Sequence, residues 1–186
     1  MASLHTLKER LMFRTHFRNG LHMFQFLLFF LVSVFSAPKE VHLGGLFAFY
    51  RMSGEAIPSG QQRLAVFLMA VKEINNSTSI LPQTKIKVSV KDTKYDVGET
   101  FFSTLELAAS SFSGKGVDAC IGAATSVESD VAATVFSKFS TVLISYAATS
   151  PLLSTKINSP YFARTCPSDS FQGAAMANLV AKYYGW

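Results

Sequence analysis

Hydroxyl side chains stand directly after two apolar segments of this 186-residue chain, at positions where they could bind a small molecule. The segment Val117 to Ile121 has the length of a buried strand, and Thr125-Ser126 follow it after a glycine turn. The next apolar segment leads into Thr149-Ser150. The carboxyl ends of parallel strands lie side by side, and a helix that starts at Thr125 or Ser126 offers free backbone N–H groups. The pattern therefore predicts a crevice for an anionic small molecule.

Each candidate residue also has a purely structural explanation, which the pattern leaves open. Ser126 could serve only as a helix N-cap, and Thr149 only as a turn hydroxyl. Arg63 falls in the first turn of a predicted helix, where its guanidinium either reaches the crevice or points into water, and its spacing alone favours water. Tyr95 falls in a strand-to-helix turn and is expected at the rim of the crevice.

Alternating strand and helix signals position these residues. Val41 to Tyr50 is rich in β-formers and predicts a central strand, whereas the polar–apolar alternation of Lys85 to Asp92 predicts an edge strand. The other predicted elements are a helix with an apolar face of Leu64, Phe67, Leu68, Val71 and Ile74, a helix from Asp96 or Thr100, the helix after Thr125-Ser126, a short strand over Pro160 to Thr165, and a last helix after Asp169. Four to five strands alternating with four helices indicate an α/β fold with a parallel sheet flanked by helices.

Several details of these helices are also predicted. Ser59 or Gly60 is expected to cap the first of them, and Phe101 is expected to face the core from the second. The last helix is expected to turn an inner side to the sheet, formed by Phe171, Ala174, Ala175, Leu179 and Val180. Because a βα series normally continues into another strand, a chain that stops on a helix is expected to be truncated.

The sequence lacks the residue sets that catalysis and metal binding need. After residue 36 it has one histidine, His42, inside a predicted strand, and no Cys or His pair at metal spacing. It has no phosphate-binding glycine loop before a helix, which argues against the alternative of a nucleotide-dependent α/β enzyme. Beyond residue 36 it carries 13 basic and 11 acidic side chains, so the formal charge of +5 is concentrated in the first residues. We expect no catalytic residue, metal or cofactor, and no nucleic-acid partner.

The first residues have the build of a secretory signal peptide. A basic start precedes Phe26 to Ala37, an uncharged apolar run of 12 residues, and Val34 and Ser36 suit the −3 and −1 positions of a cleavage site. The alternative, an uncleaved membrane anchor, is disfavoured because a bilayer span needs about 20 apolar residues. We therefore expect a signal peptide at 1–36 and a ligand-binding domain at 37–186.

Two further features agree with export. Asn75-Asn76-Ser77-Thr78 contains two overlapping N-glycosylation acceptors, Asn75 and Asn76. The chain has two cysteines, Cys120 and Cys166, which an oxidising compartment would allow to pair. Cys120 lies in an apolar strand, however, so a buried free thiol is favoured over a disulfide.

The segment IGAATSVESDVAATVFSKFSTVLISYAATSPLLS, followed by YFARTCPSDSFQGAAMANLVAKYYGW, resembles a known receptor family. It is similar to the extracellular ligand-binding domain of class C G-protein-coupled receptors, most closely metabotropic glutamate receptors, and then to the wider receptor family ligand-binding region. The resemblance covers roughly residues 41–186. It implies the first lobe of a two-lobed, periplasmic-binding-protein-like fold that closes on an amino acid, at the extracellular face of the plasma membrane, or secreted as this fragment alone.

The resemblance also implies roles for individual residues. Ser126 matches the serine that binds the α-carboxylate of the ligand, and Thr149 matches a threonine that contacts the α-amino and carboxylate groups. Ala147 stands where the family often has serine, so only a backbone carbonyl contact is expected. Arg63 matches the arginine that pairs with the distal carboxylate of glutamate, which reverses the preference for water given above. Tyr95 matches an aromatic residue at the rim.

The chain departs from the family in one loop, because the cysteine pair beside the rim aromatic is missing and Lys94 occupies one of its positions. The resemblance implies a homodimer through this lobe, and coupling to a G protein only through a transmembrane part that lies outside this sequence. A secreted or transport-type binding protein of the same fold, without transmembrane coupling, shares every residue named above and is the alternative.

Overall fold

A computed structural model of the chain describes residues 39–109, 116–157 and 159–185. Their centre is a five-stranded parallel sheet in the order β2-β1-β3-β4-β5. The strands are β1 (Glu40–Phe47), β2 (Lys85–Asp92), β3 (Ala119–Ile121), β4 (Val142–Ser145) and β5 (Phe162–Arg164). The α/β class is confirmed, with β1 inside the sheet and β2 at its edge as expected. The expected signal peptide and its cleavage site lie outside the described residues.

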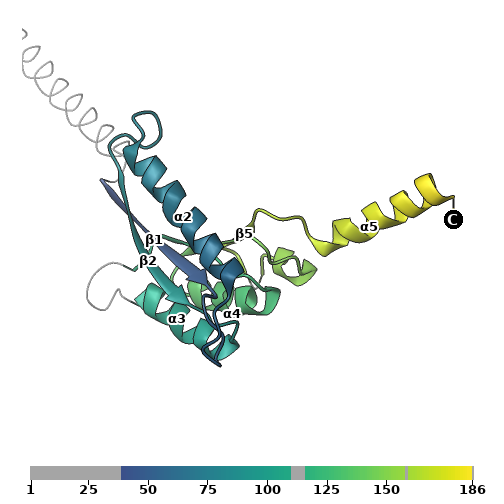
Figure 1. Cartoon of the computed structure of the whole chain (residues 1–186), viewed down its shortest axis with the longest axis horizontal. Helices are drawn as coiled ribbons and strands as arrows, with labels where there is room; N and C mark the ends of the chain where they lie inside the picture. Colours follow the sequence, from purple (N-terminus) through teal and green to yellow (C-terminus); the bar gives the residue numbers. More distant parts are fainter. Residues whose placement is uncertain (1–38, 110–115, 158, 186) are drawn as a thin grey trace, which may run out of the picture. The chain divides into compact units, whose positions relative to one another are not determined.

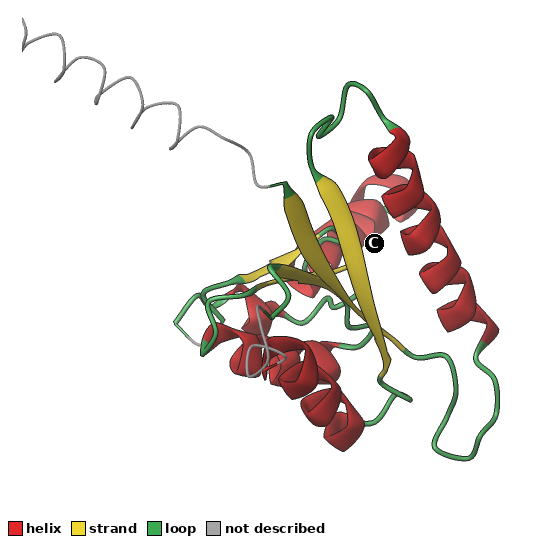
Figure 2. Cartoon of the chain, turned by 90° about the vertical axis from the view of Figure 1, so that its left-hand side faces the viewer, coloured by secondary structure: helices red, strands yellow, loops and turns green. Residues whose placement is uncertain are grey.

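Helices lie on both faces of this sheet. They are α2 (Pro58–Asn76), α3 (Val97–Ala109), α4 (Ser126–Ser137) and α5 (Asp169–Leu179), with a 3-10 turn η2 (Pro151–Ser154) and a π-helical turn η3 (Val180–Tyr184). Figures 1 and 2 show α2 on one side of the strands and α3 and α4 on the other. None of the described helices is both long and apolar enough to cross a membrane.

The main core lies between the sheet and the α3–α4 pair. Leu46, Cys120 and Leu143 come from three neighbouring strands, are fully buried, and belong to one cluster with Phe136 of α4. Small residues of α4, such as Ala132, let this helix approach the strands closely. Both cysteines are free, which agrees with the buried thiol expected for Cys120.

Two glycines allow helix and strand ends to meet at the carboxyl edge of the sheet. A Cβ atom on Gly60, in the first turn of α2, would lie 1.6 Å from the carbonyl oxygen of Ala48. A Cβ atom on Gly122, which has φ +136°, would lie 2.3 Å from the carbonyl oxygen of Leu46. Only glycine fits these contacts, so the loops after β1 and β3 are drawn onto the end of β1.

Three sequence-based details were wrong. Helix α2 begins at Pro58, so Ser59 and Gly60 lie inside its first turn and neither caps it. Proline suits the first helical position because it has no backbone N–H that would need an acceptor. Phe101 is 42% exposed and packs edge-on against Phe102, because the buried side of α3 consists of smaller residues: Thr100, Ser103, Thr104, Leu107 and Ala108. Helix α5 has no buried residue, so the inner side expected for it is not buried against the sheet.

Candidate functional site

The predicted ligand residues lie in the loops and helix starts at one edge of the sheet. All five strands run parallel, so the segments that follow β1, β2, β3 and β4 leave the sheet at the same carboxyl end. These segments carry Arg63, Tyr95, Ser126, and the pair Ala147 and Thr149. In open α/β sheets this edge is where ligands bind. The contacts of the five residues form two groups, one around Arg63 and one around Ser126 and Thr149.

Arg63 is held between two tyrosines. Its Nη1 donates a hydrogen bond to the hydroxyl of Tyr95 at 3.2 Å, and its guanidinium lies 5.4 Å from the centre of the Tyr146 ring, a cation–π distance. The Tyr146 ring stacks on Phe47 at 5.7 Å. Burial works against the charge of Arg63, but the Tyr95 hydrogen bond and the nearby phenols outweigh it and raise the pKa of the guanidinium. The result is a fixed, permanently positive group at the end of β1.

Tyr146 adds a neutral donor beside this cation. Burial, together with the nearby Tyr95 and Glu128, raises the pKa of the Tyr146 phenol to about 12, although Arg63 pulls it the other way. The phenol therefore stays protonated at neutral pH. Its hydroxyl is buried beside the Arg63 guanidinium, so it contributes to the environment of that cation.

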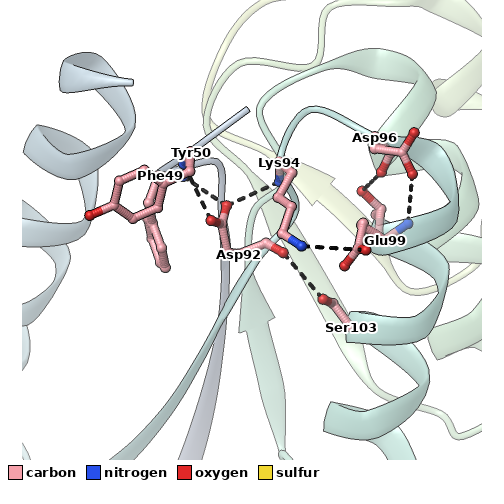
Figure 3. A network of polar contacts seen from close by, with 8 residues as sticks. Phe49, Tyr50, Asp92, Lys94, Asp96, Glu99 and Ser103 are labelled. Carbon is pink, nitrogen blue, oxygen red and sulfur yellow. Dashed lines mark hydrogen bonds and ion pairs between the residues drawn. The ribbon is translucent and has the colours of Figure 1, made fainter. Parts of the chain in front are cut away.

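A polar network fixes the loop that carries Tyr95 (Figure 3). The Asp92 carboxylate accepts hydrogen bonds from the backbone N–H of Phe49 at 2.8 Å and of Lys94 at 3.0 Å, so it joins the loops after β1 and β2. Asp96 accepts from the N–H of Glu99 at 2.8 Å at the start of α3. Between them, Lys94 and Tyr95 both have positive φ, at 53° and 54°, which is uncommon for residues other than glycine. The network thus holds a strained turn that points Tyr95 to Arg63.

The N-terminus of α4 is capped by the residue before Ser126. The Thr125 hydroxyl accepts from the N–H of Glu128 at 3.2 Å, and the buried Glu128 carboxylate accepts from the N–H of Thr125 at 3.1 Å, which forms a capping box. Because Thr125 is the cap, Ser126 is the first helical residue, and its N–H and that of Val127 have no acceptor within the helix. These two N–H groups and the helix dipole make a site for an anion.

The turn after β4 is tied to the turn after β3. The buried Ser145 hydroxyl donates to the carbonyl of Ala123 at 2.8 Å and accepts from the N–H of Ala148 at 3.0 Å. The Ser126 hydroxyl accepts from the N–H of Ser150 at 3.1 Å. These bonds place the Ala147–Ser150 turn directly beside the start of α4.

Thr149 connects this turn to an acidic residue. Its hydroxyl donates to the carboxylate of Asp169 at 3.0 Å, while the Thr149 carbonyl accepts from the N–H of Asp169 at 2.9 Å. Arg164, at the end of β5, donates to the carbonyls of Ala148 at 3.1 Å and Ser150 at 2.9 Å and so braces the same turn. This edge of the sheet therefore has acceptors at Thr149 and Asp169 in the turn beside the N–H donors at Ser126.

Sequence reasoning missed three residues of this site: Tyr146, Arg164 and Asp169. Tyr146 and Asp169 lie inside the two segments quoted above for the family resemblance, but a ligand role was predicted only for smaller residues of those segments. Tyr146 precedes the predicted ligand turn directly, and Asp169 follows the next predicted strand, so both positions could have been predicted to lie near the site. Arg164 had no such signal, because its role depends on the register of β4 against β5.

A pocket of about 640 Å³ lies between α2 and the sheet, with Arg63 and Tyr146 at its border. Its other lining is largely apolar and includes Phe47, Phe67 and Ile121. Such a surface suits packing against another apolar element better than it suits a charged amino acid. The polar edge, rather than this pocket, is therefore the candidate ligand site.

Comparison with known proteins identifies the family of the chain. The family described as "Receptor family ligand binding region" matches residues 62–186. The chain is 31% identical over 149 residues to "Glutamate receptor 3.7" of Arabidopsis thaliana, 35% identical to "Glutamate receptor 3.1" of Oryza sativa subsp. japonica, and 29% identical to "Glutamate receptor 3.2" of Arabidopsis thaliana. Each match covers 80% of this chain but only 14 to 15% of the relative. The family match spans most of the chain, and this protein therefore belongs to the family of receptor ligand-binding regions.

Proposed function

We propose that this chain is the first lobe of a receptor domain that binds an amino acid with a second carboxylate, such as glutamate. The observation that carries the proposal is the arrangement of charge along one sheet edge: N–H donors at Ser126, acceptors at Thr149 and Asp169, and a cation at Arg63. An amino acid with an acidic side chain has the complementary set of an α-carboxylate, an α-ammonium and a distal carboxylate. This is a binding role and needs no catalytic residue.

Each group of the ligand has a partner in this arrangement. The α-carboxylate takes the free N–H groups of Ser126 and Val127 and the Ser126 hydroxyl. The α-ammonium takes the free lone pairs of the Thr149 hydroxyl, the backbone carbonyl of Ala147 and the negative charge of Asp169. The distal carboxylate takes the planar guanidinium of Arg63, which Tyr95 holds in orientation.

The receptor to which this lobe belongs is itself part of the proposal. We favour a glutamate-receptor-like membrane protein with the lobe on the extracellular side, because the three named relatives are glutamate receptors of plants. A class C G-protein-coupled receptor, which the ligand motifs resemble, and a transport-type binding protein are the alternatives. Expressing the full-length gene and applying glutamate separates them: a membrane current supports the plant-type receptor, G-protein activation supports class C, and a secreted product supports transport.

We also propose that residues 1–36 are a signal peptide. The basic start and the 12-residue apolar run of Phe26 to Ala37 support this assignment. Amino-terminal sequencing of the secreted protein should begin at Ala37, and a product that retains Met1 would contradict the proposal.

Ligand-observed NMR on the isolated chain tests the binding proposal. One lobe supplies only part of the contacts and leaves the ligand open to water, so we expect millimolar affinity for glutamate. Glutarate, which has both carboxylates and no ammonium, should bind more weakly, because it leaves Thr149 and Asp169 without a partner. Equal saturation transfer to glutamate and glutarate would show that the acceptors of the crevice play no part.

A further inference from the structure

The two overlapping glycosylation acceptors at the end of α2 have different structural environments. The Asn75 side chain makes a two-point contact with the backbone of Ile86 in β2: its Nδ2 donates to the Ile86 carbonyl at 2.9 Å, and its Oδ1 accepts from the Ile86 N–H at 2.7 Å. Both asparagines are exposed, but Asn76, the next residue, makes no comparable contact with a strand among the described residues. The two acceptors therefore cannot be treated as equivalent in the folded protein.

The contact of Asn75 protects the open side of an edge strand. Among the described residues, strand β2 pairs only with β1, so the backbone groups on its other side have no strand partner there. Asn75 satisfies both groups of Ile86, whose side chain is buried at 6% exposure. This contact fixes the end of α2 against the start of β2 and closes the first βαβ unit.

A glycan on Asn75 would remove this contact. N-glycosylation attaches the sugar to Nδ2 and turns the side chain into a secondary amide, which adopts the trans form. In a trans amide the substituent lies on the same side as the carbonyl oxygen. The two-point contact with Ile86 uses Oδ1 and the Nδ2 hydrogen on the same side as Oδ1. The sugar would therefore replace the hydrogen that donates to the Ile86 carbonyl.

Asn76 has no such obstacle. Both asparagines border a mainly polar hollow of about 440 Å³ together with Pro82 and Gln83, but the Asn76 side chain is not bound to a strand there, so a sugar attached to it can extend over open surface. Its acceptor triplet is Asn76-Ser77-Thr78, whereas that of Asn75 is Asn75-Asn76-Ser77. We propose that Asn76 carries the N-glycan of this protein and that Asn75 is a structural residue that cannot carry one in the folded state. The proposal rests on export of the chain, and not on its ligand.

Two single substitutions separate the acceptors without changing either asparagine. Thr78→Ala destroys the triplet of Asn76 and leaves that of Asn75, whereas Ser77→Ala destroys the triplet of Asn75 and leaves that of Asn76. The full chain is produced in human cells, and glycans are removed enzymatically in heavy-oxygen water. Mass spectrometry then identifies the carrier asparagine as a labelled aspartate, in both the medium and the cell lysate.

We expect the label on Asn76 in the wild type and in Ser77→Ala, and no label in secreted Thr78→Ala protein. A label on Asn75 in secreted protein, or no label on the wild type at all, overturns the proposal. Protein in the cell lysate gives a second test of the proposal. Thr78→Ala chains that carry a glycan on Asn75 lack the Ile86 contact, so they should be retained in the cell and be sensitive to protease. If such chains are secreted as protease-resistant protein, the proposal fails.

Discussion

At the scale of single residues, the site separates charge by backbone geometry more than by side-chain type. Ser126 acts through its place as the first residue of α4, where two N–H groups lack helical acceptors. The Thr149 hydroxyl donates its hydrogen to the Asp169 carboxylate, which leaves the lone pairs of the hydroxyl oxygen to act as acceptors. In the proposed binding mode, the α-groups of an amino acid are bound in a way that does not depend on its side chain. Selectivity in this proposal comes from Arg63.

Replacing Ser126 by alanine tests this separation. In a chimera in which residues 39–186 replace the matched segment of the rice relative, Ser126→Ala should weaken glutamate, glutamine and alanine alike. The expected loss is about 1–3 kcal/mol, as for a hydrogen bond to a charged group. Calorimetric titration measures it, with Ser137→Ala at the far end of α4 as the control. A loss confined to glutamate would mean that Ser126 contacts the distal carboxylate.

The Tyr146 phenol predicts a pH dependence at the alkaline end. Its pKa is about 12 in the folded protein, against about 10 in an unfolded chain. The folded state therefore keeps a proton that the unfolded state loses, so this group's contribution to stability is complete below pH 10 and falls as the pH rises to 12. Tyr146→Phe should remove this part of the alkaline loss. Urea unfolding between pH 9 and 12 measures it, and identical pH slopes in both proteins would refute the assignment.

At the scale of elements, the start of α2 and the turn after β3 both pack closely on the end of β1, which sets the geometry of the candidate site. The contacts of Gly60 and Gly122 with the backbone of β1 allow it. The extent of β2 and the parallel sheet were predictable from the sequence, because alternation and the βα order carry that information. The buried side of α3 was not, since its small polar residues pack inward while Phe101 stays outside. Likewise, the Asn75–Ile86 contact depends on tertiary structure that no local pattern records.

Gly60→Ala tests the close approach of α2 to β1. An added Cβ atom 1.6 Å from the Ala48 carbonyl forces the helix to shift, and overpacking of this kind costs at least about 2 kcal/mol. Gly173→Ala in α5, where an added Cβ meets nothing within 4 Å, is the matched control and should be neutral or stabilising by up to about 1 kcal/mol. Chemical unfolding of both variants measures the difference. Equal stabilities would show that α2 does not approach β1 this closely.

At the scale of the whole molecule, the proposal gives this chain one side of a binding site. The chain spans 14 to 15% of the length of the relatives it matches, and Arg63 belongs both to the charged edge and to the border of the apolar pocket. Ligand-dependent switching requires a second surface whose position differs between the free and bound states. The sequence indicated this division through family resemblance, whereas the charge pattern along the edge emerged only from the fold.

The central claim, that this edge selects a dicarboxylic amino acid, is tested most directly by Arg63. In the chimera with the rice relative, affinities for glutamate, glutamine and alanine are measured for the wild type, Arg63→Ala and Arg51→Ala. Arg51 is an exposed arginine that pairs with Glu55 and serves as the control. We predict that Arg63→Ala loses the preference for glutamate over alanine while its affinity for alanine is unchanged, and that Arg51→Ala behaves like the wild type. If Arg63→Ala keeps the full preference for glutamate, the arginine is not the partner of the distal carboxylate, and the proposed selectivity is wrong.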